Sequence, residues 1–249
     1  MKRALLCVAL LLLTVPVLAE TPDGYERLVL SIAPSYSLCG YHSRYDTRLL
    51  VFNDGDVNDG DIKGPRPICT GGTCYPPEAR KAITIEGPIT MTPLPAFLYV
   101  PRDLVKSAHL TLMVESSDRE RGSRAFAEIP ILHESDFQSR LQLLGVRVEK
   151  SFRVTLRIYG LDTPDDALSV MRIFDMDTNE LLTEEIYGFE RFPSAPSMAM
   201  ECDISDIGPL VMDRNLRIEV VTNSDDVKAY AFVSTTDNAT QRFTIITPK

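Results

Sequence analysis

Short segments in which every second residue is apolar are the feature that most constrains the fold of this chain. In the segment 151–159, SFRVTLRIY, apolar side chains alternate with Arg and Thr, and the segments 109–115 and 215–221 follow the same pattern. A period of two with one apolar face is typical of a β-strand that is buried on one side only. We therefore expect antiparallel sheets whose inner faces meet in a core.

Turn-forming residues interrupt the chain at short intervals. Clusters of Asn, Asp, Gly, Pro, Ser or Thr stand at 53–55, 64–65, 163–165, 177–179 and 223–226. Further apolar runs lie near 27–33, 47–53, 81–86, 96–100, 124–132, 168–174, 181–187, 197–203, 227–234 and 242–247. Helix is expected only for single turns near 135–141 and 203–206. Many short strands with frequent turns predict an all-β sandwich or barrel.

A faint internal repeat predicts two domains. Residues 97–131 and 200–234 share the order of an opening segment, two strands and a polar turn between the strands. We expect two tandem antiparallel β-sandwiches over 20–148 and 149–249, similar to immunoglobulin-like modules, although the chain has no Trp for the Cys–Trp–Cys core of antibody domains. Domains of roughly this length hide about two-thirds of their unfolded surface, so each can hold a core. One larger sandwich or barrel is the alternative.

The first 19 residues have the layout of a secretory signal peptide. Two basic residues precede an apolar run over 4–13, and Val-Leu-Ala at 17–19 places small residues before Glu20. This run is shorter than the roughly 20 residues that a membrane-spanning helix needs. We expect cleavage after residue 19 and a periplasmic or secreted protein with no membrane span. An uncleaved anchor is the alternative.

The charge balance excludes one class of partner. The chain has 26 Lys and Arg against 35 Asp and Glu, a formal net charge of −9. Cleavage of the signal removes two more basic residues. Nucleic-acid binding draws most of its affinity from Lys and Arg that neutralise phosphates, so an acidic chain is a poor nucleic-acid binder.

Four of the five cysteines follow the predicted signal peptide, and an even number in an oxidising compartment favours disulfides. Cys69 and Cys74 are the first candidate pair, because two glycines between them let the chain turn back. Cys39 competes for either partner, and Cys202 is the fourth. Four cysteines allow three connectivities, and a zinc site is the alternative use of the close pair.

Catalytic motifs are scarce. The histidines are His42, His109 and His133, and no Gly-x-Ser-x-Gly turn accompanies them. His133 and Asp136 are the residues that a catalytic triad could use. The many acidic residues leave open a pair of carboxylates such as glycosidases use. No catalytic residue is therefore assigned.

An acidic segment at 53–61, NDGDVNDGD, suggests a calcium site. Asp54, Asp56 and Asn58 match the first three ligand positions of a calcium-binding loop, where hard oxygen ligands are needed. Asp59 stands where that loop requires Gly, and Pro65 stands where it requires Glu. A solvated acidic turn is the alternative.

A second unusual segment is rich in Tyr. Tyr36, Tyr41, Arg44 and Tyr45 lie in YSLCGYHSRY, which has the composition of antibody-type binding loops. We expect these residues to contact a protein or a glycan at the cell envelope; a loop pinned by its cysteine and by buried rings is the alternative. The function hypothesis is an exported, non-catalytic binding or structural protein. A secreted hydrolase with an unrecognised carboxylate or metal site is the second hypothesis.

Overall fold

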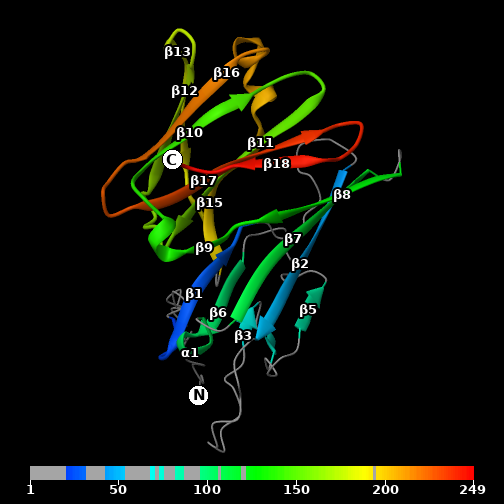
Figure 1. Ribbon diagram of the computed structural model, residues 1–249. Coiled ribbons are helices and arrows are strands. Elements are labelled where there is room, and N and C mark those ends of the chain that lie inside the picture. The colour runs from blue at the N-terminus through cyan, green and yellow to red at the C-terminus, as the bar shows by residue number, and fades with distance from the viewer. Residues whose placement is uncertain are drawn as a thin grey trace, which may run out of the picture.

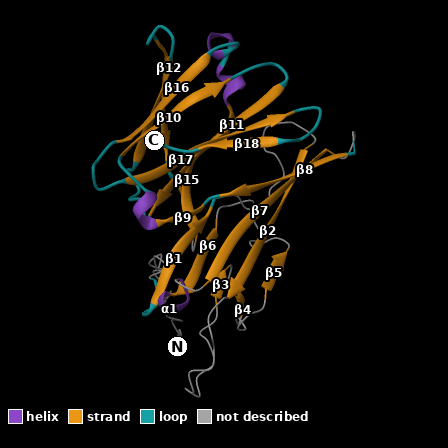
Figure 2. Ribbon diagram, viewed as in Figure 1, coloured by secondary structure: helices purple, strands orange, loops and turns teal. Residues whose placement is uncertain are grey.

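The computed structural model describes residues 21–31, 43–53, 68–70, 73–75, 82–86, 96–105, 108–118, 122–192 and 195–249. Over these residues the protein is mostly β, with one short α-helix (Figures 1 and 2). The described strands form four antiparallel sheets, none of which closes into a barrel. The predicted all-β fold class is therefore confirmed, and the immunoglobulin-like arrangement stays a prediction.

The elements of the N-terminal half are β1 (Tyr25–Leu30), β2 (Ser43–Asn53), β3 (Ile68–Thr70), β4 (Thr73–Tyr75), β5 (Ala82–Glu86), β6 (Ala96–Pro101), α1 (Arg102–Val105), β7 (Ala108–Asp118), β8 (Ser123–Ile129), β9 (Ile131–His133) and the 3-10 turn η1 (Glu134–Asp136). Those of the C-terminal half are β10 (Arg140–Arg147), β11 (Phe152–Leu161), β12 (Leu168–Asp175), β13 (Leu181–Gly188), β14 (Glu190–Phe192), β15 (Ala195–Asp203), η2 (Ile204–Ile207), η3 (Pro209–Val211), β16 (Asn215–Thr222), β17 (Lys228–Asp237) and β18 (Phe243–Ile246).

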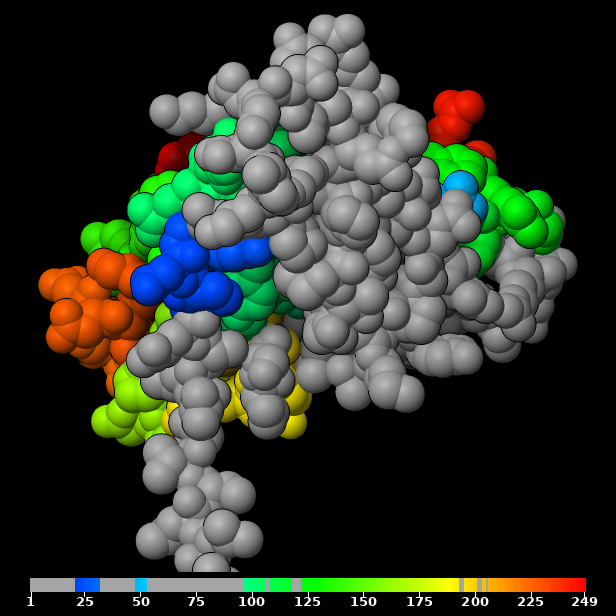
Figure 3. Space-filling view, turned by 90° about the horizontal axis from the view of Figure 1, so that it is seen from below, coloured from blue at the N-terminus to red at the C-terminus, as the bar shows by residue number. Residues whose placement is uncertain are grey.

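Two sheets of the N-terminal half enclose a common core. Their strand orders are β4-β3-β6-β1-β9 and β5-β2-β7-β8. Leu28 and Leu98 enter the core from the first sheet, and Leu49 and Leu112 enter it from the second. In the view from below, residues 21–31 (blue) lie beside residues 96–105 (green), as the antiparallel pairing of β1 with β6 requires (Figure 3).

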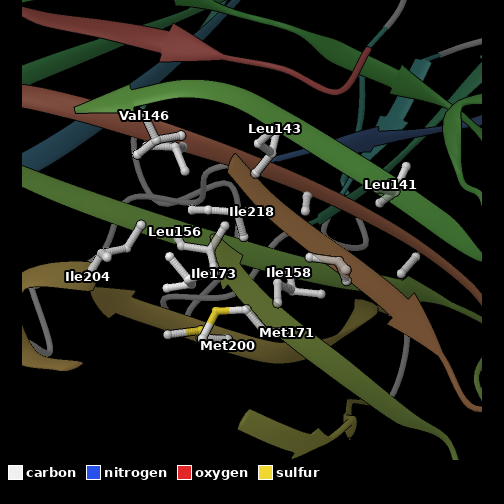
Figure 4. Packing of buried hydrophobic residues seen from close by; sticks show 14 of the residues in the cluster. Leu141, Leu143, Val146, Leu156, Ile158, Met171, Ile173, Met200, Ile204 and Ile218 are labelled. Atoms are coloured by element: carbon white, nitrogen blue, oxygen red, sulfur yellow. The ribbon is translucent and has the colours of Figure 1, made fainter. Parts of the chain in front are cut away.

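The C-terminal half has its own pair of sheets and its own core. The strand orders are β10-β16-β12-β13 and β14-β15-β11-β17-β18. Leu143, Ile218 and Ile173 meet Leu156 and Met200 between the two sheets (Figure 4). The chain changes from the first pair of sheets to the second between β9 and β10. The boundary near residue 148 stays a prediction, and β10, which precedes it, pairs with β16 beyond it.

β11 departs from the half-buried strand that its alternation predicts. Its apolar residues face the C-terminal core, as expected, yet Arg153 and Arg157 on the opposite face are buried as well. The reason is that this face of the sheet packs on the N-terminal half, where Tyr159, Tyr230 and Phe232 join the first core cluster. The sheet that contains β11 is thus a central layer with cores on both sides.

The short helical turns are only partly as expected. η2 confirms the turn near 203–206, but the turn expected at 135–141 is wrong beyond Asp136. β10 begins at Arg140 because Leu141 and Leu143 alternate into the core and pair with β16. Across the part of the chain that is described, α1 and the 3-10 turns are too short to traverse a bilayer.

Candidate functional site

Most of the predicted binding and calcium residues lie outside the described ranges: Tyr36, Tyr41, Asp54, Asp56 and Asn58. Cys39, a candidate for a disulfide, also lies outside them. Arg44 and Tyr45 lie on β2, where their backbones pair with Ser117 and Ser116 of β7. Among the described residues, no three potential ligands of the His, Cys, Asp or Glu type gather as a metal site. The tyrosine-rich surface and the calcium loop both stay predictions.

The backbone register bears on the predicted disulfide. Cys69 on β3 lies directly opposite Cys74 on β4. Opposite residues in antiparallel strands have Cα atoms about 4.5–5.5 Å apart, which is inside the range that a disulfide spans. Cys202 lies on β15, opposite Leu156 of β11. The register is thus compatible with the first candidate pair.

A buried guanidinium joins the two halves. Arg27 of β1 is only 6 % exposed; its Nε donates to Glu134 Oε1 at 2.7 Å, and its Nη1 donates to Asp162 Oδ1 at 2.9 Å. Its Nη2 contacts the other oxygen of Asp162, and its guanidinium carbon lies 4.7 Å from the ring centre of Phe97. Burial lowers the pKa of Arg27, but the hydrogen bonds and charges of the two carboxylates outweigh burial and raise it. The forked, charge-assisted contact fixes β1 on the loop after β11.

Aromatic rings and neutral hydrogen bonds complete this junction. Tyr159 and Phe232 have ring centres 6.0 Å apart, and Tyr230 lies 6.5 Å from Phe232. The Tyr159 hydroxyl donates to the backbone oxygen of Ser31. Burial, and then the nearby charge of Asp136, raises the pKa of Tyr230 to about 12. We call Arg27, Tyr159, Tyr230 and Phe232 the junction. Its side chains hold the molecule together.

His133 lies at the solvent-exposed rim of the junction. Its Nδ1 is 2.7 Å from Glu26 Oε1, while Asp136 Oδ2 accepts the backbone N–H of His133 at 2.7 Å. The Asp136 carboxylate therefore binds the backbone of His133, and a triad of His133 with Asp136 stays unassigned. The three-residue turn η1 directs the Asp136 carboxylate to the backbone, and the carboxylate beside the imidazole comes from β1.

The hairpin of β12 and β13 carries exposed apolar side chains. β13 is the last strand of its sheet and, among the described strands, pairs only with β12. Ile186 is 62 % exposed and Leu181 is 48 % exposed. The turn of this hairpin lies at the end of the molecule opposite the N-terminal sheets (Figure 1). We call β13 from Leu181 to Gly188 the open edge.

Acidic residues crowd the open edge. Residues 173–190 contain six Asp and Glu and no Lys or Arg. Glu184 Oε2 contacts Arg172 Nε of β12 at 2.5 Å. Glu180, Glu185 and Glu190 are exposed, and none of them contacts a basic side chain among the described residues. The edge therefore combines exposed apolar side chains with uncompensated negative charge.

Cross-strand rows order the outer face of this sheet. Val170 lies opposite Val221 on one side and Ile186 on the other, which makes an apolar row that ends at the open edge. Arg172 lies opposite both Glu219 and Glu184 in the next row along the strands. Two apolar side chains, or two side chains of opposite charge, stabilise neighbouring strands when they lie directly opposite one another. Each row would continue into a further strand placed beside β13.

Comparison with known proteins identifies no relative: no family model, no curated protein and no solved structure matches this chain.

Sequence reasoning missed both the junction and the open edge. Glu26 and Asp162 carry no motif. Glu26 meets His133 because β1 pairs with β9, and Asp162 meets Arg27 because β1 packs against the C-terminal half. The sequence does indicate the acidic character of the open edge, because the acidic run over 173–190 coincides with two of the expected strands. Its meaning depends on β13 being the last strand of a sheet.

Proposed function

We propose that this protein is exported and works outside the cytoplasm as a non-catalytic binding or structural protein of the periplasm, cell surface or extracellular space. The signal-peptide layout of residues 1–19 supports export. The observation that carries the binding role is the open edge, where Ile186 and Leu181 are exposed on a strand with an unpaired side among the described strands.

Physical reasons make such an edge a binding surface. The N–H and C=O groups on the outer side of a terminal strand are a template for another strand, and proteins commonly cover or shorten such edges. Exposed apolar side chains grouped beside polar ones mark interaction sites. β13 has eight residues, which is long for a strand whose outer side pairs with none of the described strands.

Capture from the cell envelope tests this function. The protein, purified from the cells that make it, is used as bait with gentle cross-linking in an envelope extract. Retention of a defined set of envelope components is expected. Empty captures at several protein concentrations would contradict a binding role.

We also propose that Cys69 and Cys74 form a disulfide in the exported protein. Their direct opposition on β3 and β4 supports this pairing. Peptide mapping by mass spectrometry without reduction is expected to find the two residues linked. Detection of Cys69 linked to Cys39 or Cys202 would contradict the proposal.

One contact favours hydrolysis as a second candidate function. The 2.7 Å contact of His133 Nδ1 with Glu26 Oε1 is the arrangement that orients an imidazole for general-base catalysis. A panel of chromogenic esters and glycosides tests it. Turnover that is lost in His133→Ala and kept in His109→Ala supports a hydrolase, and absence of turnover in the unaltered protein argues against one.

A further inference from the structure

We propose that the open edge binds an extended, basic segment of a partner protein as an added β-strand. This inference rests on the proposed binding function and names the partner by its chemistry. The strand that we expect to bind has two consecutive Lys or Arg residues flanked by apolar residues. Such addition uses backbone hydrogen bonds for affinity and side chains for choice of partner.

The sequence of β13 determines what the added strand must carry. Glu184 and Glu185 are consecutive, so they project to opposite faces of the sheet. A matching strand therefore needs two consecutive basic residues, one for each face. Ile186 follows them and continues the apolar row of Val221 and Val170, so the adjacent position of the partner is apolar.

Charge disfavours a second copy of this chain in the fully overlapped register. Antiparallel pairing of two β13 strands over 181–188 places Glu184 of each copy opposite Glu185 of the other. Like charges directly opposite one another destabilise a pair of strands. The run without Lys or Arg over 173–190 extends this repulsion along the hairpin. A basic partner meets attraction along the same length.

Neighbouring contacts hold the open edge in a shape that receives a strand. Asp175, at the end of β12, accepts the backbone N–H groups of Asp177 and Thr178 at 2.9 and 3.1 Å, and it binds Arg214 at 2.5 Å. Phe189 is buried at the other end of β13 and anchors the chain as it leaves the strand. Both ends of β13 are therefore fixed by residues of the same half. A fixed strand loses less conformational freedom on binding.

A designed peptide tests the proposal. The probe is Val-Thr-Val-Lys-Arg-Val-Thr-Val with blocked ends and a fluorophore, which presents the basic pair in either strand direction. Fluorescence anisotropy with the purified protein is expected to show saturable binding. The double variant Glu184→Lys/Glu185→Lys is expected to bind at least about tenfold more weakly, because two attractive pairs become repulsive.

Matched controls separate an added strand from general attraction to an acidic protein. Asp225→Lys/Asp226→Lys makes the same change in net charge in an exposed turn of the same half and is expected to bind within about twofold of the unaltered protein. Far-UV circular dichroism checks that each variant is folded. Equal weakening in both double variants would overturn the proposal.

Two modified peptides test strand addition without changing the protein. One carries N-methyl groups on its odd-numbered residues and the other on its even-numbered residues. Alternate residues of a strand donate to one side, so one peptide is expected to lose at least about tenfold in affinity and the other to bind nearly normally. Equal affinities of the two modified peptides would overturn strand addition. Self-association that is lost in Glu184→Lys/Glu185→Lys would identify a second copy as the occupant and would also overturn the proposal.

The outcomes separate this inference from the proposed function. If the unaltered protein and Glu184→Lys/Glu185→Lys capture the same envelope components, the protein binds through another surface and only the inference fails. If the unaltered protein captures nothing, the proposed function fails with it.

Discussion

The junction and the open edge both bring charged side chains next to apolar ones, and they treat them in opposite ways. At the junction, one cation, Arg27, is enclosed by Glu134, Asp162 and the ring of Phe97. At the open edge, Glu184 and Glu185 stand beside exposed Ile186, and only Arg172 offers them a cation among the described residues. The charged groups of the junction find their partners within one chain, whereas those of the open edge would find theirs in the strand that we propose.

This difference shows where a mutation matters for folding and where it matters for binding. A group whose partners lie in the same chain contributes to the free energy of unfolding. A group whose partner lies on another molecule can be changed at little cost to folding. The same substitution made in both regions therefore separates the two roles.

The largest contrast is expected from removal of one apolar side chain in each region. Phe232→Ala is expected to lower the free energy of unfolding by about 4 kcal/mol, because Phe232 is 1 % exposed and its removal leaves a cavity. Ile186→Ala is expected to change it by less than about 0.5 kcal/mol. Urea unfolding measures both. Similar losses in the two variants would contradict the contrast.

A smaller contrast is expected from removal of one guanidinium in each region. Arg27→Met is expected to cost about 2 kcal/mol, because three charge-assisted contacts are lost while Asp162 and Glu134 still reach water. Arg172→Met removes a partly exposed ion pair and is expected to cost about 0.5 kcal/mol. Thermal unfolding of both variants at neutral pH measures the difference. Equal losses of stability in the two variants would show that Arg27 contributes no more than a residue at the surface.

The junction is also expected to weaken at high pH. Burial raises the pKa of Tyr230 to about 12, above the value of about 10 of an exposed Tyr. Its contribution to stability is therefore complete below pH 10 and is lost as the pH rises toward 12, because the unfolded chain ionises first. Unfolding by urea across this range is expected to show a smaller loss in Tyr230→Phe. An identical loss in the variant would show that other groups cause it.

The hairpin that carries the open edge is expected to weaken at low pH. Hydrogen bonds lower the pKa of Asp175: first the one from Arg214, and then those from the backbone N–H groups of Thr178 and Asp177. Its contribution is therefore present above about pH 4 and is lost as the pH falls through the lowered pKa. In Asp175→Asn, the difference in stability between pH 7 and pH 3 is expected to shrink slightly. Hydrogen exchange in β12 and β13 locates the change.

Much of the fold could be predicted because the alternation of apolar and polar residues along a strand indicates which face of the strand is buried. β7, β11 and β16 lie where the pattern places strands, and the runs at 168–174 and 181–187 are β12 and β13. The second face of β11 could not be predicted, since Arg157 on a strand ordinarily indicates a solvent face. It is buried because this face of the sheet packs on the N-terminal half, and it donates to Ser234 at 2.9 Å.

Less of the candidate site could be predicted, because its residues become neighbours only through tertiary packing. Glu26 and His133 are distant in the sequence and meet because β1 pairs with β9. The acidic character of 181–188 is visible in the sequence, but whether a strand lies at an edge depends on the order of the strands in its sheet. That order is a global property, and no local pattern encodes it.

The fork of Arg27 and Asp162 also has a consequence for the order in which the chain can mature. The two residues are 135 positions apart, and a chain is synthesised from its N-terminus. β1 therefore leaves the ribosome well before the carboxylate that completes its environment. Until Asp162 has been made, the N-terminal half can offer Arg27 only Glu134 of its two carboxylate partners. The surroundings of β1 are therefore complete only when both halves are present.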